Sequence, residues 1–143
     1  MKTKDLKFPI FSFGKIGDNM IYVCFNENDF CTASLSILKS EDFNNEKIID
    51  SRGNVFYIKK ANFVKYKGLF GYTSLLSTDK QVVISYEYHD KTDRISLENF
   101  KKQIIPMVEN MKDIWEEAYG DIEELKTLIT KSVSFVEIAE LLG

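Results

Sequence analysis

Hydrophobic and polar positions alternate along several segments before residue 90, and this period of two is the pattern of half-buried β-strands. Phe30–Leu38 alternates apolar side chains with Thr32, Ser34 and Ser36, which predicts one strand. Gln81–His89 alternates in the same way, and Asp90–Asp93 predicts a turn that closes it. Met20–Phe25 is apolar on both faces, which is typical of a central strand.

Shorter signals complete the first part of the chain. Turn residues with a glycine between two β-type runs predict a hairpin around Asp50–Asn54, with strands at Ile48–Ile49 and Val55–Ile58. The other segments are a strand at Phe8–Phe13, a turn at Gly14–Asn19, a surface loop at Lys39–Glu46, a further strand at Ala61–Tyr66 and a bend at Gly68 and Gly71.

From Ser96 the period becomes helical. At 100° per residue, one set of apolar side chains shares an arc of roughly 120°. That arc keeps its register across Pro106, which lies on the opposite, polar side. We therefore expect one helix from Leu97 to Tyr119, kinked at the proline. The apolar set is Leu97, Phe100, Ile104, Met107, Val108, Met111, Ile114, Trp115 and Ala118.

Capping signals predict two more helices near the end of the chain. Gly120 is a suitable stop for the long helix. Asp121 precedes Glu124 by three residues, and Ser134 precedes Glu137 by three, which is the spacing of an N-cap followed by an acid. The helices are expected at Ile122–Lys131 and Phe135–Leu142.

The order of the elements predicts an α+β fold in a single domain, residues 1–143, with a strand-rich part at 8–90 and a helical part at 96–143. We expect a mainly antiparallel N-terminal sheet of about five to seven strands. A long kinked helix and two shorter helices pack against it. The pattern leaves open whether the sheet is curved and open or forms a partly closed barrel.

Composition narrows the class of protein. The 143 residues are 44% hydrophobic and 29% charged, which is typical of a soluble globular chain. No apolar run approaches the roughly 20 residues of a membrane span, and the basic start is not followed by the apolar core of a signal peptide. We therefore expect a cytoplasmic protein in which Cys24 and Cys31 are buried, reduced thiols.

Candidate catalytic chemistry is sparse. His89 is the single histidine, and Glu87 is the carboxylate that shares its face of the predicted strand. Two such groups without a third ligand make a weak metal site, and neither cysteine is placed by the sequence beside His89. Gly14–Gly17 and Gly68–Gly71 lack the further residues of phosphate-binding loops. We expect no catalytic set, no metal and no cofactor.

Negative charge is concentrated towards the C-terminal end. Residues 96–143 hold 5 basic and 10 acidic side chains, whereas residues 1–95 hold 14 basic and 12 acidic ones. An acidic helix face disfavours nucleic acid there but suits a partner protein with a basic surface, because complementary charge accelerates association. The candidate partner-binding residues are Glu109, Asp113, Glu116, Glu117, Asp121 and Glu124.

A second candidate surface interleaves lysines with aromatic side chains over residues 59–72. Such a segment on a sheet can hold single-stranded nucleic acid or an acidic protein surface, although it contains no arginine. The ordinary alternative is a solvated strand, and exposed tyrosines there would also suit a homo-oligomer contact. The candidate residues are Lys59, Lys60, Lys65, Tyr66 and Lys67; Phe63 is a further aromatic among them, and Phe70 and Tyr72 follow.

The segments Phe11–Gly14, Tyr22–Cys24 and Ile48–Gly53, in a compact chain rich in Lys, Asn and Ile, resemble those of small bacterial immunity proteins. These proteins neutralise toxin domains of contact-dependent and other polymorphic toxin systems. The resemblance implies a non-enzymatic inhibitor that binds a toxin domain, and it implies no particular fold and no functional residue. A nucleic-acid-binding module and a structural or adaptor domain are the alternatives.

Overall fold

The computed structural model describes residues 5–14, 19–68 and 80–143. These residues confirm the predicted α+β fold, with six strands in one antiparallel sheet of order β2-β1-β4-β5-β6-β3. The strands are β1 (Ile10–Phe13), β2 (Ile21–Cys24), β3 (Thr32–Ser34), β4 (Lys47–Ile49), β5 (Asn54–Tyr66) and β6 (Gln81–Arg94). The helices are α1 (Glu27–Phe30), α2 (Leu35–Ser40), α3 (Leu97–Asn110), α4 (Lys112–Tyr119), α5 (Ile122–Lys131) and α6 (Phe135–Leu142).

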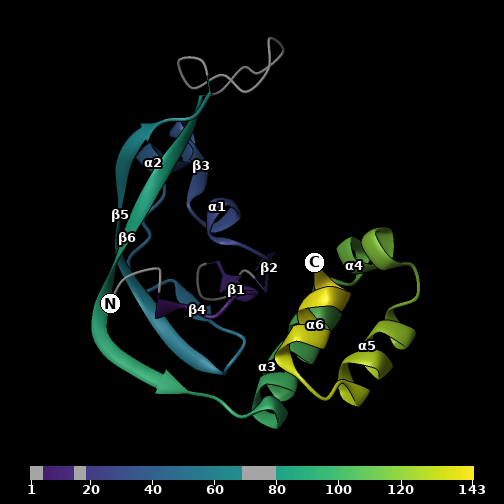
Figure 1. Ribbon diagram of the computed structural model, residues 1–143. Helices are drawn as coiled ribbons and strands as arrows, with labels where there is room; N and C mark the ends of the chain where they lie inside the picture. The colour runs from purple at the N-terminus through teal and green to yellow at the C-terminus, as the bar shows by residue number, and fades with distance from the viewer. Residues whose placement is uncertain (1–4, 15–18, 69–79) are drawn as a thin grey trace.

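The strands β5 and β6 form a long curved ribbon that extends past the rest of the sheet (Figure 1). Their lower halves curl towards the helices α3–α6, whereas their upper halves rise above those helices, with β3 and α2 beside them. We call the upper part, residues 59–67 and 80–87, the β5–β6 arm. The ribbon therefore carries one end into the body of the protein and presents the other to solvent.

Two separate groups of buried side chains cover opposite faces of the sheet. Neighbouring residues of one strand enter different groups, because successive side chains of a strand point to opposite faces. Phe11 and Ile49 pack against α3–α6, while Ile10 and Ile48 pack against Phe30 of α1 on the other face. The helical group also contains Phe100, Ile104, Val108, Trp115, Leu125, Ile129, Phe135 and Ile138.

The long helix differs from the expectation at one point. α3 does continue through Pro106, as its apolar register predicts, but it ends at Asn110. Met111 leaves the helical conformation, with φ −115° and ψ 39°, and α4 starts afresh at Lys112. The prediction of one helix over Leu97–Tyr119 is therefore wrong. One consequence is that Ile114, assigned by its spacing to the buried arc, is exposed.

Three strand predictions and one turn prediction also need correction. Phe30–Leu38 is not one strand: β3 is flanked by α1 and α2, because the side chains of Asn26 and Ser34 accept backbone N–H bonds that start those helices. Asp90–Asp93 is not a turn, because β6 continues to Arg94 against β5. Ala61–Tyr66 is the second half of β5, and the segment predicted as a central strand forms β2 at the edge of the sheet.

The capping predictions are confirmed. The Asp121 carboxylate accepts the backbone N–H groups of Glu123 and Glu124 at the start of α5, and Ser134 accepts that of Glu137 at the start of α6. α4 stops at Gly120, which adopts a φ of 113°. The hairpin between β4 and β5 is also as predicted. The turn at Gly14–Asn19 and the bend at Gly71 lie wholly or partly outside the described residues.

Candidate functional site

The six predicted partner-binding carboxylates lie on α3, α4 and the start of α5, but the chain's own residues already hold three of them. Glu109 pairs with Lys126 of α5 at 2.7 Å, and the same ammonium contacts Glu123 at 3.2 Å. The hydrogen bonds that the Lys126 ammonium donates to the carboxylates of Glu109 and Glu123 raise the pKa of Lys126. Lys112 pairs with Glu116 one turn along α4, at 3.6 Å. These ion pairs and the Asp121 cap stabilise the helices, so these three carboxylates are less available to a partner protein.

The other three carboxylates remain available at the surface. Asp113, Glu117 and Glu124 are exposed, and among the described residues no lysine or arginine pairs with them. Exposed Ile114 lies next to Asp113 on α4. We call these four residues the acidic face. It is smaller than the predicted surface, although it combines charge with one apolar side chain.

The second predicted surface lies on the β5–β6 arm. Phe63, Val64 and Tyr66 are 47%, 51% and 45% exposed, and they lie within the last four residues of β5. The β5–β6 register shifts between Phe63 and Lys65. A β-bulge at this point explains how Phe63 and Tyr66, an odd and an even position, come to lie with ring centroids 5.2 Å apart. Lys80, the residue before β6, places its ammonium 5.3 Å from the centroid of the Tyr66 ring.

The predicted lysines of this segment differ in their surroundings. Lys59, Lys60 and Lys65 are exposed. Lys60 stands opposite Glu87 of β6, whose carboxylate accepts a hydrogen bond from Asn62 at 2.8 Å. Lys67 donates to the side chains of Asn28 and Thr32, at 3.3 and 3.4 Å, and so ties β5 to the α1–β3 segment. Phe70 and Tyr72 lie outside the described residues.

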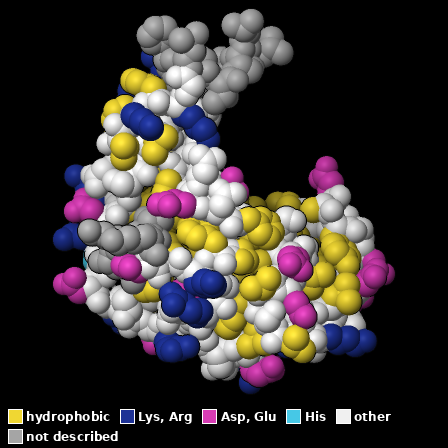
Figure 2. Space-filling view, in the orientation of Figure 1, with side chains coloured by type: hydrophobic (Ala, Val, Ile, Leu, Met, Phe, Trp, Pro, Cys, Tyr) yellow, Lys and Arg dark blue, Asp and Glu magenta, His cyan; other side chains and the backbone are white. Residues whose placement is uncertain are grey.

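Apolar and basic side chains adjoin one another along this arm. Figure 2 shows hydrophobic and Lys or Arg side chains together on its upper part, with Asp and Glu side chains lower on the same face. The three exposed apolar residues belong to neither group of core side chains. The sequence pattern includes Phe63 and Tyr66 with the lysines but not Val64, and it does not indicate how far these three side chains are exposed. Their exposure depends on how far β5 projects beyond the body of the protein, which a local pattern does not encode.

Candidate catalytic groups are scattered and held by structural contacts. His89 Nε2 lies 2.7 Å from the Asn44 side-chain oxygen. Cys24 and Cys31 are thiols rather than a disulfide, and burial raises the pKa of Cys24 to about 11. Burial also raises the pKa of Tyr86, whose hydroxyl donates to the Phe30 carbonyl. Burial therefore favours the neutral forms of Cys24 and Tyr86, and His89 is hydrogen-bonded to Asn44.

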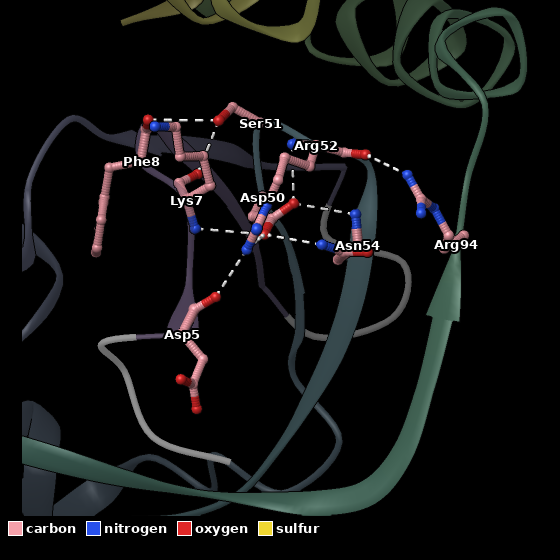
Figure 3. Close-up of polar contacts among 8 residues, drawn as sticks. All are labelled: Asp5, Lys7, Phe8, Asp50, Ser51, Arg52, Asn54 and Arg94. Atoms are coloured by element: carbon pink, nitrogen blue, oxygen red, sulfur yellow. Dashed lines mark hydrogen bonds and ion pairs between the residues drawn. The ribbon is translucent and has the colours of Figure 1, made fainter.

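Asp50 is a fully buried carboxylate, and it fixes the β4–β5 turn (Figure 3). It accepts hydrogen bonds from the backbone N–H groups of Arg52 at 2.9 Å, Asn54 at 3.0 Å and Lys7 at 3.3 Å, and from the Asn54 side chain. Arg52 lies 3.5 Å from it and donates to the Asp5 carbonyl. These contacts occupy the carboxylate with backbone donors, so the cluster joins the N-terminal segment to the turn.

Comparison with family models, with curated proteins and with solved structures finds no match for this chain. In the described part of the chain, no three His, Cys, Asp or Glu side chains are grouped so that they could hold a metal ion. None of the helices described has the length and apolar character needed to cross a bilayer.

Proposed function

We propose that this chain is a non-enzymatic binding protein that presents the β5–β6 arm to a partner protein. The observation that carries the proposal is the exposure of Phe63, Val64 and Tyr66 on a strand that projects from the core. Buried aromatic anchors dominate the energy of protein interfaces. An arm with apolar side chains on both faces of one strand suits an apolar groove in the partner, with acidic groups at its rim to meet Lys59 and Lys65.

Nucleic acid is the alternative ligand for the same arm, and two contacts argue against it. Base stacking needs an accessible aromatic face. The Tyr66 ring has the Lys80 ammonium near it and the edge-on Phe63 ring against it. Lys67 is already bound by Asn28 and Thr32, so it contributes less to holding a phosphate backbone. The arm therefore favours a protein over single-stranded nucleic acid.

Within this class, the role that we propose is inhibition of a bacterial toxin domain in the cytoplasm. The support is the resemblance of Phe11–Gly14, Tyr22–Cys24 and Ile48–Gly53 to bacterial immunity proteins. An inhibitor of this kind acts by covering a surface of the toxin, which requires contact side chains rather than a catalytic set. The exposed arm supplies such side chains.

The decisive experiment is affinity capture from the native host, followed by titration of the captured protein with purified variants. Combining Phe63→Ser with Tyr66→Ser should weaken binding at least about 30-fold, since each change removes an aromatic anchor. The matched control is Tyr22→Ser, which removes an aromatic of similar exposure on β2, away from the arm. Equal affinity of the double variant and the wild type, or capture of nucleic acid alone, would rule out the proposal.

The acidic face supports a second candidate, a partner with a basic surface. The specific observation is that Asp113 and Glu117 remain exposed beside exposed Ile114, whereas Glu109 and Glu116 are paired within the chain. Reversing charge at Asp113, Glu117 and Glu124 to lysine should slow association with the captured protein and reduce its dependence on salt. Glu140→Lys on α6 is the control for one such charge change. An association rate that is unchanged by the triple variant would exclude this face.

A further inference from the structure

The β5–β6 arm carries positive charge that the chain itself does not neutralise. Its two segments, residues 59–67 and 80–87, hold five lysines and one glutamate. Lys59, Lys60 and Lys65 are exposed, and among the described residues none of the three forms an ion pair. These lysines follow one strand beside the exposed apolar side chains of Phe63 and Val64. The arm is therefore a basic surface with apolar contacts along it.

The acidic face carries the opposite charge in a similar line. Asp113 and Glu117 stand one turn apart on α4, and Glu124 follows in the first turn of α5. A hollow of about 340 Å³ adjoins exposed Ile114, where the chain leaves the helical conformation at Met111. The acidic face thus combines carboxylates with one apolar side chain and a recess that can receive another.

One copy of the chain does not bring these two surfaces together. The arm rises above the helices, and α4 stands across an open notch from it (Figure 1). The space-filling view shows the same notch, with Lys or Arg side chains on the arm and an Asp or Glu side chain at the upper margin of the helical part (Figure 2). A two-fold rotation about an axis through the notch exchanges the positions of the arm and the helices. Each surface of one copy then meets its complement on the other.

We propose that two copies of this chain associate about such an axis, each laying its β5–β6 arm against the acidic face of the other. The arm lysines meet the carboxylates of α4 and α5, and Phe63 or Val64 enters the hollow beside Ile114. Tyr66 contributes less, because the Lys80 ammonium and the Phe63 ring already lie against it. The two-fold axis makes this contact twice and closes the assembly at two copies.

The dimer covers the arm that the proposed partner protein also needs, so self-association and partner binding exclude each other. Sedimentation equilibrium of the purified chain measures the dimer without any partner. Exposed ion pairs are individually weak and are screened by salt. We therefore expect a dimer that forms as protein concentration rises, with a dissociation constant that increases at least about tenfold between about 0.05 M and about 0.5 M salt.

Two charge-reversal variants test the contact from either side. The arm variant combines Lys59→Glu, Lys60→Glu and Lys65→Glu, and the face variant combines Asp113→Lys, Glu117→Lys and Glu124→Lys. Each places like charges opposite each other at both contacts and should raise the dimer dissociation constant at least about 30-fold. The control combines Lys102→Glu with Lys131→Glu, two exposed lysines of α3 and α5 that belong to neither surface, and it should leave the constant unchanged.

Mixing the arm variant with the face variant is the decisive step. In a mixed pair the unchanged arm meets the unchanged carboxylates, and the reversed arm meets the reversed face, so both contacts are attractive again. The mixture should form a heterodimer with a dissociation constant within about threefold of the wild-type value, although each variant alone stays monomeric. This recovery also shows that both variants are folded.

Three results would overturn the proposal. They are a wild-type chain that stays monomeric at every concentration and salt, assemblies that grow beyond two copies, and a mixture that stays monomeric although both variants keep the wild-type circular dichroism. A wild-type dimer whose constant the face variant does not change would equally exclude the acidic face. All of these measurements use this chain alone, so their outcome is separate from that of the titration with a captured partner.

Discussion

Gly53 shows how a single residue joins distant parts of the chain. It has a φ of +82° in the β4–β5 turn, a conformation that favours glycine. Its carbonyl accepts from Ile95, just before α3, and a Cβ built on it would stand 2.5 Å from the Ile95 carbonyl oxygen. The turn itself was predicted from Asp50–Asn54. The burial of Asp50 was not, because it depends on Lys7, which is far away in the sequence.

Gly53→Ala should therefore lower the free energy of unfolding by about 2–4 kcal/mol, through backbone strain and the clash with Ile95. Gly120→Ala is a matched control, because Gly120 also has a positive φ but no atom within 4 Å of a built Cβ. It should cost about 1–2 kcal/mol from strain alone. Urea denaturation of both variants gives the difference, and equal losses would show that the contact with Ile95 is unimportant.

The Cys24 thiol provides a second prediction at the level of one residue. Burial raises its pKa to about 11, with smaller contributions from Asp29 and Cys31. Only the thiolate reacts with iodoacetamide, so at pH 8 the native protein should be alkylated at Cys24 about 100-fold more slowly than a thiol of ordinary pKa 9.0. The rate should increase tenfold per pH unit up to about pH 10. Mass spectrometry of native and urea-unfolded protein measures it, and equal rates in the two states would contradict the shift.

The helices show what a local pattern can and cannot encode. Caps at Asp121 and Ser134 are local hydrogen bonds between a side chain and the next turn, so the sequence predicted α5 and α6 correctly. The end of α3 at Asn110 carries no such signal. The proline predicts a kink at position 106, yet the helix is interrupted at Met111. The Met111 N–H still donates to the carbonyls of Met107 and Val108. Because of this interruption α4 does not continue the apolar register of α3, and Ile114 is exposed. The acidic surface therefore differs from the predicted one.

Pro106→Ala should stabilise the protein. Pro106 is exposed, so its removal creates no cavity, while alanine supplies the N–H that an uninterrupted helix uses and has the higher helix propensity. We expect a gain of about 1–3 kcal/mol in the free energy of unfolding, measured by urea denaturation. A loss instead would mean that the packing of α3 against the sheet depends on a bend at the proline.

At the scale of the whole molecule, the two groups of core side chains share their strands. β1, β4 and β5 each contribute adjacent residues to both groups, as with Val55 in the helical group and Phe56 in the other. Disrupting the packing of either group therefore also destabilises the strands on which the other group is built. The exposed surface of the β5–β6 arm was predicted only in part. How far this arm projects depends on how all the strands assemble into the sheet, and a local sequence pattern does not encode that.

This coupling can be measured with the single tryptophan, Trp115, which lies in the helical group. Ile58 is 1% exposed in the other group, and Ile58→Ala should cost about 2–5 kcal/mol through the cavity it leaves. The variant should shift the urea midpoint of Trp115 fluorescence and that of far-UV circular dichroism together. A fluorescence midpoint that stays at the wild-type value would show that the two faces unfold separately.

The strand order also bears on how the nascent chain matures on the ribosome. β3 is completed early in translation but pairs with β6, and β1 is covered on one face by α3–α6, which are made after all the strands. The strands therefore keep Phe11 and Phe13 uncovered until those helices have been made. A truncated product ending before Leu97 exposes that apolar face, which makes such fragments ready substrates for chaperones and proteases.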